Sequence, residues 1–153
     1  SFLPARFNLA NLYYDLGENN SSIKVLRDGI EINPNIGELY YSLGLLLVEE
    51  KQLERAEKEI KRAIELIEDR PRLFYNYGLV LQNLNRKKEA ETALTKAYGL
   101  APSDPDITYA LVIFHAQQQQ WHEALPYAQQ LVSLLPERPE LKKLHLDIQS
   151  KQN

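Results

Sequence analysis

Residues 71–104 read PRLFYNYGLVLQNLNRKKEAETALTKAYGLAPSD, and the pattern of this segment recurs along the chain with a period of 34 residues. Four similar short stretches, each opened by an aromatic residue, begin at Phe7, Tyr41, Tyr75 and Tyr109. Two further sets of positions follow the same 34-residue period. One holds the small residues Ser22, Ala56, Ala90 and Ala124, and the other holds the prolines Pro34, Pro102 and Pro136. Self-similarity at a fixed period of this length is the sequence signature of a repeat architecture.

Inside each period, large residues recur at steps of four, which is the spacing of one helical face. The large residues of this face are Leu9, Tyr13, Leu43, Leu47, Tyr77 and Leu81. Gly44 and Gly78 lie on the same face, and glycine inside a helix costs about 0.5–1 kcal/mol relative to alanine. We therefore expect two helices to approach closely at these glycines. The pattern predicts helices at 4–16, 20–32, 37–50, 53–67, 71–84, 87–100, 105–118 and 121–134, with Gly17 and Asn85 as left-handed ends of first helices.

The 34-residue period with its small and large positions resembles the tetratricopeptide repeat, a helix–turn–helix unit. The third unit matches it at Phe74, Tyr77, Gly78, Leu81, Ala90, Leu94, Ala97 and Pro102. The resemblance covers four units, at about 3–36, 37–70, 71–104 and 105–138. It implies an all-α fold in which residues 1–153 form a single domain, a right-handed solenoid of helix pairs.

The two ends of the chain are expected to differ. Leu141, Leu144 and Ile148 form one apolar stripe, which predicts a capping helix over about 139–151 with a polar outer face. No comparable cap precedes Phe7, so Phe2 and Leu3 are expected to be exposed, and this uncapped end could join two copies of the chain. The chain begins at Ser1 and contains no methionine, so we expect an excised piece of a longer protein, with a processed chain as the alternative. The resemblance to the repeat family implies a bacterial protein.

Residues that could carry chemistry are sparse. The chain has no cysteine, which excludes disulfides and thiolate metal sites, and no phosphate-binding, hydrolase or metalloprotease motif occurs. His115 and His122 fall on different predicted helices, so a structural role is expected and no metal. The net charge of −3 argues against nucleic-acid binding, and no apolar run is long enough to span a membrane. We expect neither catalytic residues nor a cofactor.

By its resemblance to tetratricopeptide arrays, the chain should line its concave face with the first helix of each unit. The fifth position of each unit holds Phe7, Tyr41, Tyr75 and Tyr109, and the ninth holds Asn11, Leu45, Leu79 and Ile113. Arg72, Asn76 and Gln82 complete the predicted peptide-binding groove. In this interpretation aromatic side chains anchor a partner peptide and amides pair with its backbone. The alternative is that the tyrosines only fill space within the helix pairs.

Two functions from different classes follow from the resemblance. The first is a protein–protein interaction scaffold or adaptor that binds a partner protein or peptide and is not an enzyme. The alternative is an accessory domain of a larger bacterial enzyme, multihaem cytochrome or assembly factor, because Ala101-Pro102-Ser103-Asp104-Pro105 is similar to repeat segments of such proteins. A catalytic domain is the weakest option. A clamp for terminal carboxylates is not expected, since among its corresponding positions only Asn11 and Arg72 carry suitable side chains.

Overall fold

The computed structural model describes residues 3–152, and within them the chain forms nine helices and no strand. The helices are α1 (Leu3–Asp15), α2 (Asn19–Ile32), α3 (Gly37–Glu49), α4 (Leu53–Leu66), α5 (Pro71–Asn83), α6 (Lys87–Leu100), α7 (Pro105–Gln117), α8 (Trp121–Leu134) and α9 (Pro139–Ser150). Every end agrees with the predicted helices to within one residue. The prolines Pro34, Pro102 and Pro136 each lie two residues beyond a second helix, as predicted.

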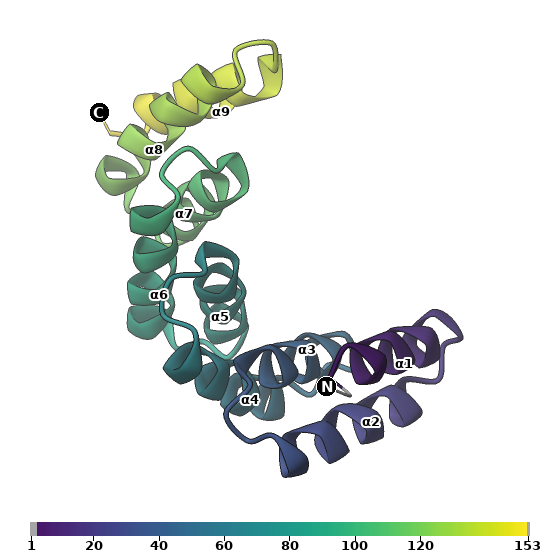
Figure 1. Cartoon of the computed structure of the whole chain (residues 1–153). Coiled ribbons are helices and arrows are strands. Elements are labelled where there is room, and N and C mark those ends of the chain that lie inside the picture. The colour runs from purple at the N-terminus through teal and green to yellow at the C-terminus, as the bar shows by residue number, and fades with distance from the viewer. Residues whose placement is uncertain (1–2, 153) are drawn as a thin grey trace.

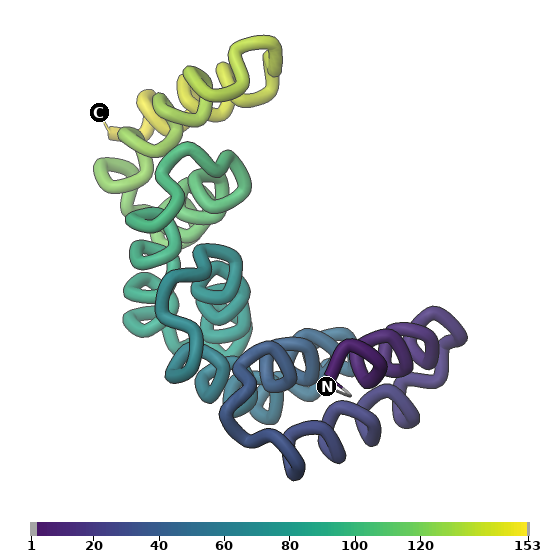
Figure 2. The backbone as a smooth tube through the Cα atoms, in the orientation of Figure 1, coloured from purple at the N-terminus to yellow at the C-terminus, as the bar shows by residue number. Residues whose placement is uncertain are grey.

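The helices pack as consecutive pairs that stack into a curved row (Figure 1, Figure 2). Each helix contacts the next one along the chain, both within a pair and between pairs. The odd-numbered helices α1, α3, α5 and α7 line the inner side of the curve, and the even-numbered helices lie outside. Each unit therefore packs mainly on its neighbours, which is the organisation of a solenoid and confirms the predicted fold class.

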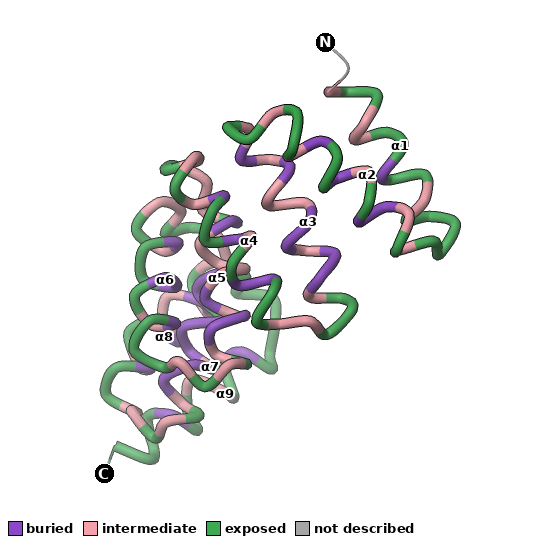
Figure 3. Tube along the Cα trace, turned by 90° about the horizontal axis from the view of Figure 1, so that it is seen from below, coloured by how far each residue is buried: buried purple, intermediate pink, exposed green. Residues whose placement is uncertain are grey.

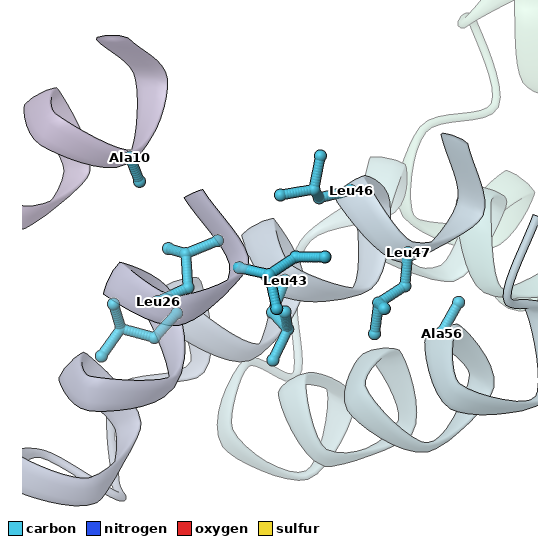
Figure 4. Packing of buried hydrophobic residues seen from close by; sticks show 8 residues of the cluster. Ala10, Leu26, Leu43, Leu46, Leu47 and Ala56 are labelled. Atoms are coloured by element: carbon cyan, nitrogen blue, oxygen red, sulfur yellow. The ribbon is translucent and has the colours of Figure 1, made fainter. Parts of the chain in front are cut away.

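Close contact inside each pair is set by small residues. A Cβ atom added at Gly44 would lie 2.5 Å from Cγ1 of Ile60, and one added at Gly78 would lie 2.7 Å from Cγ of Leu94. Ala56 and Ala90, the small residues of the second helices, are fully buried. Buried positions follow the facing sides of the helices along the whole row (Figure 3). In Figure 4, side chains from α2, α3 and α4, with Leu43 among them, meet in one such cluster.

The turn within each pair uses the left-handed backbone region. Gly17 and Asn85 have φ angles of 74° and 59°, as predicted, and Lys51 and Gln119 adopt 58° and 59° at the corresponding places. In each turn the following amide donates back to the last turn of the helix, as Gln52 N does to the Leu47 oxygen at 2.9 Å. These bonds form the Schellman arrangement, which satisfies carbonyls at the helix end and holds residues other than glycine in this conformation.

The first unit differs from the prediction in burial. Leu9, placed by its period on a buried face, is 42% exposed, and Leu12 and Leu16 are also exposed. In the second unit α2 covers the corresponding face of α3, but no helix among residues 3–152 covers this side of α1. Leu3 is partly buried against the first core cluster, so the expectation that it is exposed is wrong. Phe2 lies outside the described residues.

The terminal helix α9 packs on α8 as a cap. Leu141 and Ile148 are buried and Leu144 is partly buried, as the apolar stripe predicts. Leu146 is exposed and interrupts the otherwise polar outer face.

A polar trio connects the second and third units. Glu57 on α4 is 9% exposed and accepts a hydrogen bond from the hydroxyl of Tyr77 at 3.0 Å. The same carboxylate pairs with the guanidinium of Arg86 at 3.1 Å. Burial, followed by the neighbouring carboxylate, raises the pKa of Tyr77 above its ordinary value.

We expect the free energy of unfolding to fall at alkaline pH, in part through Tyr77. Because the folded state holds this phenolic proton more tightly than the unfolded chain, its contribution is complete below the ordinary tyrosine pKa of about 10 and is lost as the pH rises above it. Urea unfolding at a series of pH values from neutral to alkaline measures the slope. Tyr77→Phe should flatten this slope, and a slope equal to that of the parent would exclude Tyr77 as a contributor.

Candidate functional site

The predicted groove residues belong to the helices that line the inner side of the curve. They are Phe7 and Asn11 on α1, Tyr41 and Leu45 on α3, Arg72, Tyr75, Asn76, Leu79 and Gln82 on α5, and Tyr109 and Ile113 on α7. All of them are partly buried or exposed, whereas the core positions Leu43, Leu47 and Leu81 on the same helices are fully buried. We call this set of partly buried and exposed side chains on the inner helices the groove.

The polar side chains of the groove bond from one inner helix to the next. The Asn76 Nδ2 donates to the hydroxyl of Tyr41 at 2.7 Å, and the Gln82 Nε2 donates to Oε1 of Gln117 at 2.7 Å. Each bond uses one donor of an amide that has a second N–H and an acceptor oxygen. The amides predicted to pair with a ligand therefore also orient neighbouring units.

Ion pairs also connect neighbouring units, at the beginnings of the inner helices. Arg70 pairs with Glu38 at 3.0 Å, and Arg72 pairs with Asp104 at 3.4 Å and with Asp106 at 3.2 Å. Arg70 and Asp104 are not among the groove residues predicted from the sequence. The available signal was the opposite charge of the second and last positions in the second and third units, which are Glu38 with Arg70 and Arg72 with Asp104.

The same arginines cover two of the groove tyrosines. The guanidinium of Arg70 lies 5.9 Å from the centre of the Tyr41 ring, and that of Arg72 lies 5.0 Å from the centre of the Tyr75 ring. These distances are within the range of cation–π attraction. Burial raises the pKa of both tyrosines above the ordinary value, which favours the neutral phenol.

Hollows lie at both ends of the inner surface. A pocket of about 230 Å³ where α1, α2 and α3 meet is lined by groove residues Asn11 and Leu45, together with Tyr14 and Glu49. A pocket of about 350 Å³ lies between the starts of α7 and α9 and includes Tyr109. On the outer side, a more apolar pocket of about 410 Å³ is lined by Ile64, Phe74, Tyr77, Glu89, Thr92, Ala93 and Lys96.

The histidine that could have suggested chemistry is part of the core. His115 is buried, its Nδ1 lies 3.0 Å from Oε1 of Gln120, and its ring stacks on Tyr127. This placement agrees with the predicted structural role. Across the described range, no group of three acidic, histidine or cysteine residues is arranged to hold a metal ion. None of the helices within residues 3–152 is long and apolar enough to cross a membrane.

Comparisons with known proteins agree with this architecture. A family model described as TPR repeat matches residues 10–50, and one described as tetratricopeptide repeat matches residues 37–70 and 71–104. A search of curated proteins found no match.

Several solved structures share the fold. The crystal structure of MamA protein is 17% identical with a TM-score of 0.83, over 97% of this chain and 86% of that one. YrrB, described as a TPR protein with an unusual peptide-binding site, is 20% identical with a TM-score of 0.83, over 96% of this chain and 76% of that one. A tetratricopeptide repeat protein from Parabacteroides merdae is 14% identical with a TM-score of 0.88, over 97% of this chain and 59% of that one.

Proposed function

Since this chain belongs to the tetratricopeptide repeat family, we propose that it is a non-catalytic scaffold or adaptor that holds a segment of a partner protein in the groove. The curvature of a solenoid creates the extended concave surface that such repeat proteins use for binding. Repeats of this family support a role in protein–protein interaction. The described peptide-binding site of YrrB, a protein of similar fold, is consistent with a peptide as ligand here.

The observation that carries the proposal is the row of partly exposed aromatic and apolar side chains in register on successive inner helices. Tyr41, Tyr75 and Tyr109 form one line of this row, and Leu45, Leu79 and Ile113 form the other. Tyrosine is enriched among the residues that dominate binding energy at protein interfaces, because its large ring buries apolar area while the hydroxyl keeps a polar partner. Such a row favours an extended peptide over a small compact ligand.

The charges of the groove favour apolar burial as the main source of affinity. Arg70 and Arg72 are already paired with Glu38, Asp104 and Asp106. An incoming peptide would therefore find few unpaired charges in the middle of the groove, and exposed ion pairs contribute only about 0–1 kcal/mol each.

Peptides selected on the immobilised chain from a random display library provide the test. We expect their binding to be lost in Leu79→Arg, which places a charge in the groove, and retained in Thr92→Arg, which places the same charge on the outer pocket. The Debye length becomes much shorter between about 0.1 M and 1 M salt, so ion pairs weaken over this range. Because few ion pairs are expected to hold the peptide, its affinity should fall by less than about fivefold. Thermal melts establish that both variants are folded.

The reverse result would contradict the proposal. Peptides that bind Leu79→Arg as well as the parent and fail on Thr92→Arg would assign recognition to the outer pocket. A steep loss of affinity with salt would show that ion pairs, and not apolar burial, hold the partner.

A further inference from the structure

The groove tyrosines differ in what covers their rings. Tyr41 and Tyr75 each carry an arginine from this chain, at 5.9 and 5.0 Å from the ring centre. Tyr109 occupies the same position in the next unit, yet within residues 3–152 no lysine or arginine covers its ring, and the residue is 46% exposed. The ring of Tyr109 is thus accessible to a side chain from a partner.

The cause is a change of charge between units. The position that holds Arg72 in the third unit holds Asp106 in the fourth, so the basic side chain that covers Tyr75 has no counterpart beside Tyr109. Asp106 is already paired with Arg72 at 3.2 Å.

Arg138 lies two periods of 34 residues after Arg70. Its position relative to Tyr109 in the fourth unit is therefore the same as that of Arg70 relative to Tyr41 in the second unit. Arg138 lies instead 4.0 Å from Glu140 at the start of α9, and both side chains are about 60% exposed. A pair at this distance and exposure contributes little. Arg138 is therefore not held over Tyr109.

The open face belongs to a defined hollow. Tyr109 lines the pocket of about 350 Å³, which we call the Tyr109 pocket, and this volume lies in the range of ligand-binding sites. Apolar side chains line much of it, and they are Pro105, Leu131, Leu135 and Leu141. Its charged groups are two carboxylates, Asp106 and Glu140, and one guanidinium, Arg138.

We propose that the Tyr109 pocket binds an arginine or lysine side chain of the partner segment held in the groove, an inference that rests on the function proposed above. The stem of such a residue would lie along the leucines, and its charged end would lie over Tyr109 near Asp106 and Glu140. The preceding unit supplies the precedent, since Arg72 stacks on Tyr75 while pairing with Asp104 and Asp106. Arginine should bind better than lysine, because its planar guanidinium can stack and form two hydrogen bonds at once.

Blocked tripeptides with arginine, lysine, leucine or glutamate between two alanines test this on the whole chain. We expect the arginine peptide to shift the NMR signals of Tyr109 in a saturable way, the lysine peptide to do so more weakly, and the glutamate peptide not at all. The signals of Tyr75 should stay in place, because Arg72 already covers that ring.

Three variants separate the groups involved. Tyr109→Leu should abolish saturable binding of the arginine peptide, which is followed in this variant at the signals of Leu131 and Leu141 in the same pocket. Glu140→Gln, which leaves the contacts of Arg72 intact, should weaken binding by about threefold to fivefold, the scale of one exposed ion pair. Arg138→Gln should strengthen binding by a similar factor, because it removes the like charge from the pocket.

Preference for the glutamate peptide, with loss of binding in Arg138→Gln, would make this a carboxylate site and overturn the proposal. Absence of a saturable shift with any peptide would overturn it as well. Library-selected peptides distinguish this failure from that of the groove. If Leu79→Arg abolishes their binding while Tyr109→Leu and Glu140→Gln do not, the groove function stands and only the basic-residue pocket is wrong. If the arginine tripeptide binds at Tyr109 but no selected peptide depends on Leu79, the pocket stands and the groove function fails.

Discussion

Gly44→Leu is expected to lower the free energy of unfolding by about 3 kcal/mol, the upper end of the usual cost of overpacking a core. The added Cβ would lie 2.5 Å from Cγ1 of Ile60 and 3.3 Å from its backbone nitrogen. Since backbone lies behind the side chain, a rotamer change of Ile60 cannot relieve the contact, and α4 has to move away from α3. Ala90→Leu should act similarly from the second helix of the next pair, because Ala90 is fully buried and its carbonyl oxygen lies 3.3 Å from the Cβ position of Gly78.

Gly99 provides the matched control for this experiment. It also lies in a helix, but a Cβ added there meets no atom within 4 Å. Gly99→Ala should leave stability unchanged or raise it by up to about 1 kcal/mol, because glycine is a poor helix former. Urea unfolding of the three variants measures the differences. A Gly44→Leu protein as stable as the parent would show that α3 and α4 do not approach at this glycine.

Tyr75→Ala is expected to weaken binding of a library-selected peptide by about 2 kcal/mol, which corresponds to about a 30-fold higher Kd. Tyr75 lies at the centre of the row between Tyr41 and Tyr109, where a bound peptide would exclude water most completely. Its ring is partly buried and covered on one side by Arg72, so it is held in place before the peptide arrives. A fixed ring loses little conformational freedom on binding, which favours a large contribution. Isothermal titration calorimetry with the parent and the variant measures the change.

The neighbouring residue Phe74 supplies a control of similar size. It lies on the same helix but lines the outer pocket with Ile64 and Lys96. Phe74→Ala removes a comparable ring from the opposite surface and should change the affinity by less than about twofold, within the usual range for residues outside an interface core. A large loss in Phe74→Ala with none in Tyr75→Ala would place the partner on the outer surface.

The sequence by itself determined the repeat and almost every helix boundary. Each unit carries its own local signals, which are a four-residue spacing of large residues, a small residue where two helices touch, and proline after the second helix. Because the contacts of a solenoid are mostly between neighbours, local signals repeated four times are sufficient to predict the fold. They also indicated which helices line the inner side of the curve (Figure 1), and the predicted groove residues on these helices are partly buried or exposed.

Other features depended on contacts between units. Lys51 and Gln119 adopt left-handed turns that their residue types do not predict, since the backbone bonds of the helix end hold them there. Leu9 has the spacing of a core residue but is exposed, because burial depends on the presence of a covering helix and not on the period. The local sequence pattern predicts on which face of a helix a residue lies. Only the packing of the helices determines whether another helix covers that face.

The charged side chains of the groove likewise depend partly on the sequence and partly on the packing of the helices. The sequence contains all these charges, but only the structure shows that Arg72 pairs with Asp104 and Asp106 and covers Tyr75. Tyr109 is open because Asp106 stands at the position of Arg72 and because Arg138, which follows the same period as Arg70, lies beside Glu140. Pairing of long side chains depends on how neighbouring helices pack against each other, and the periodic sequence does not specify that packing.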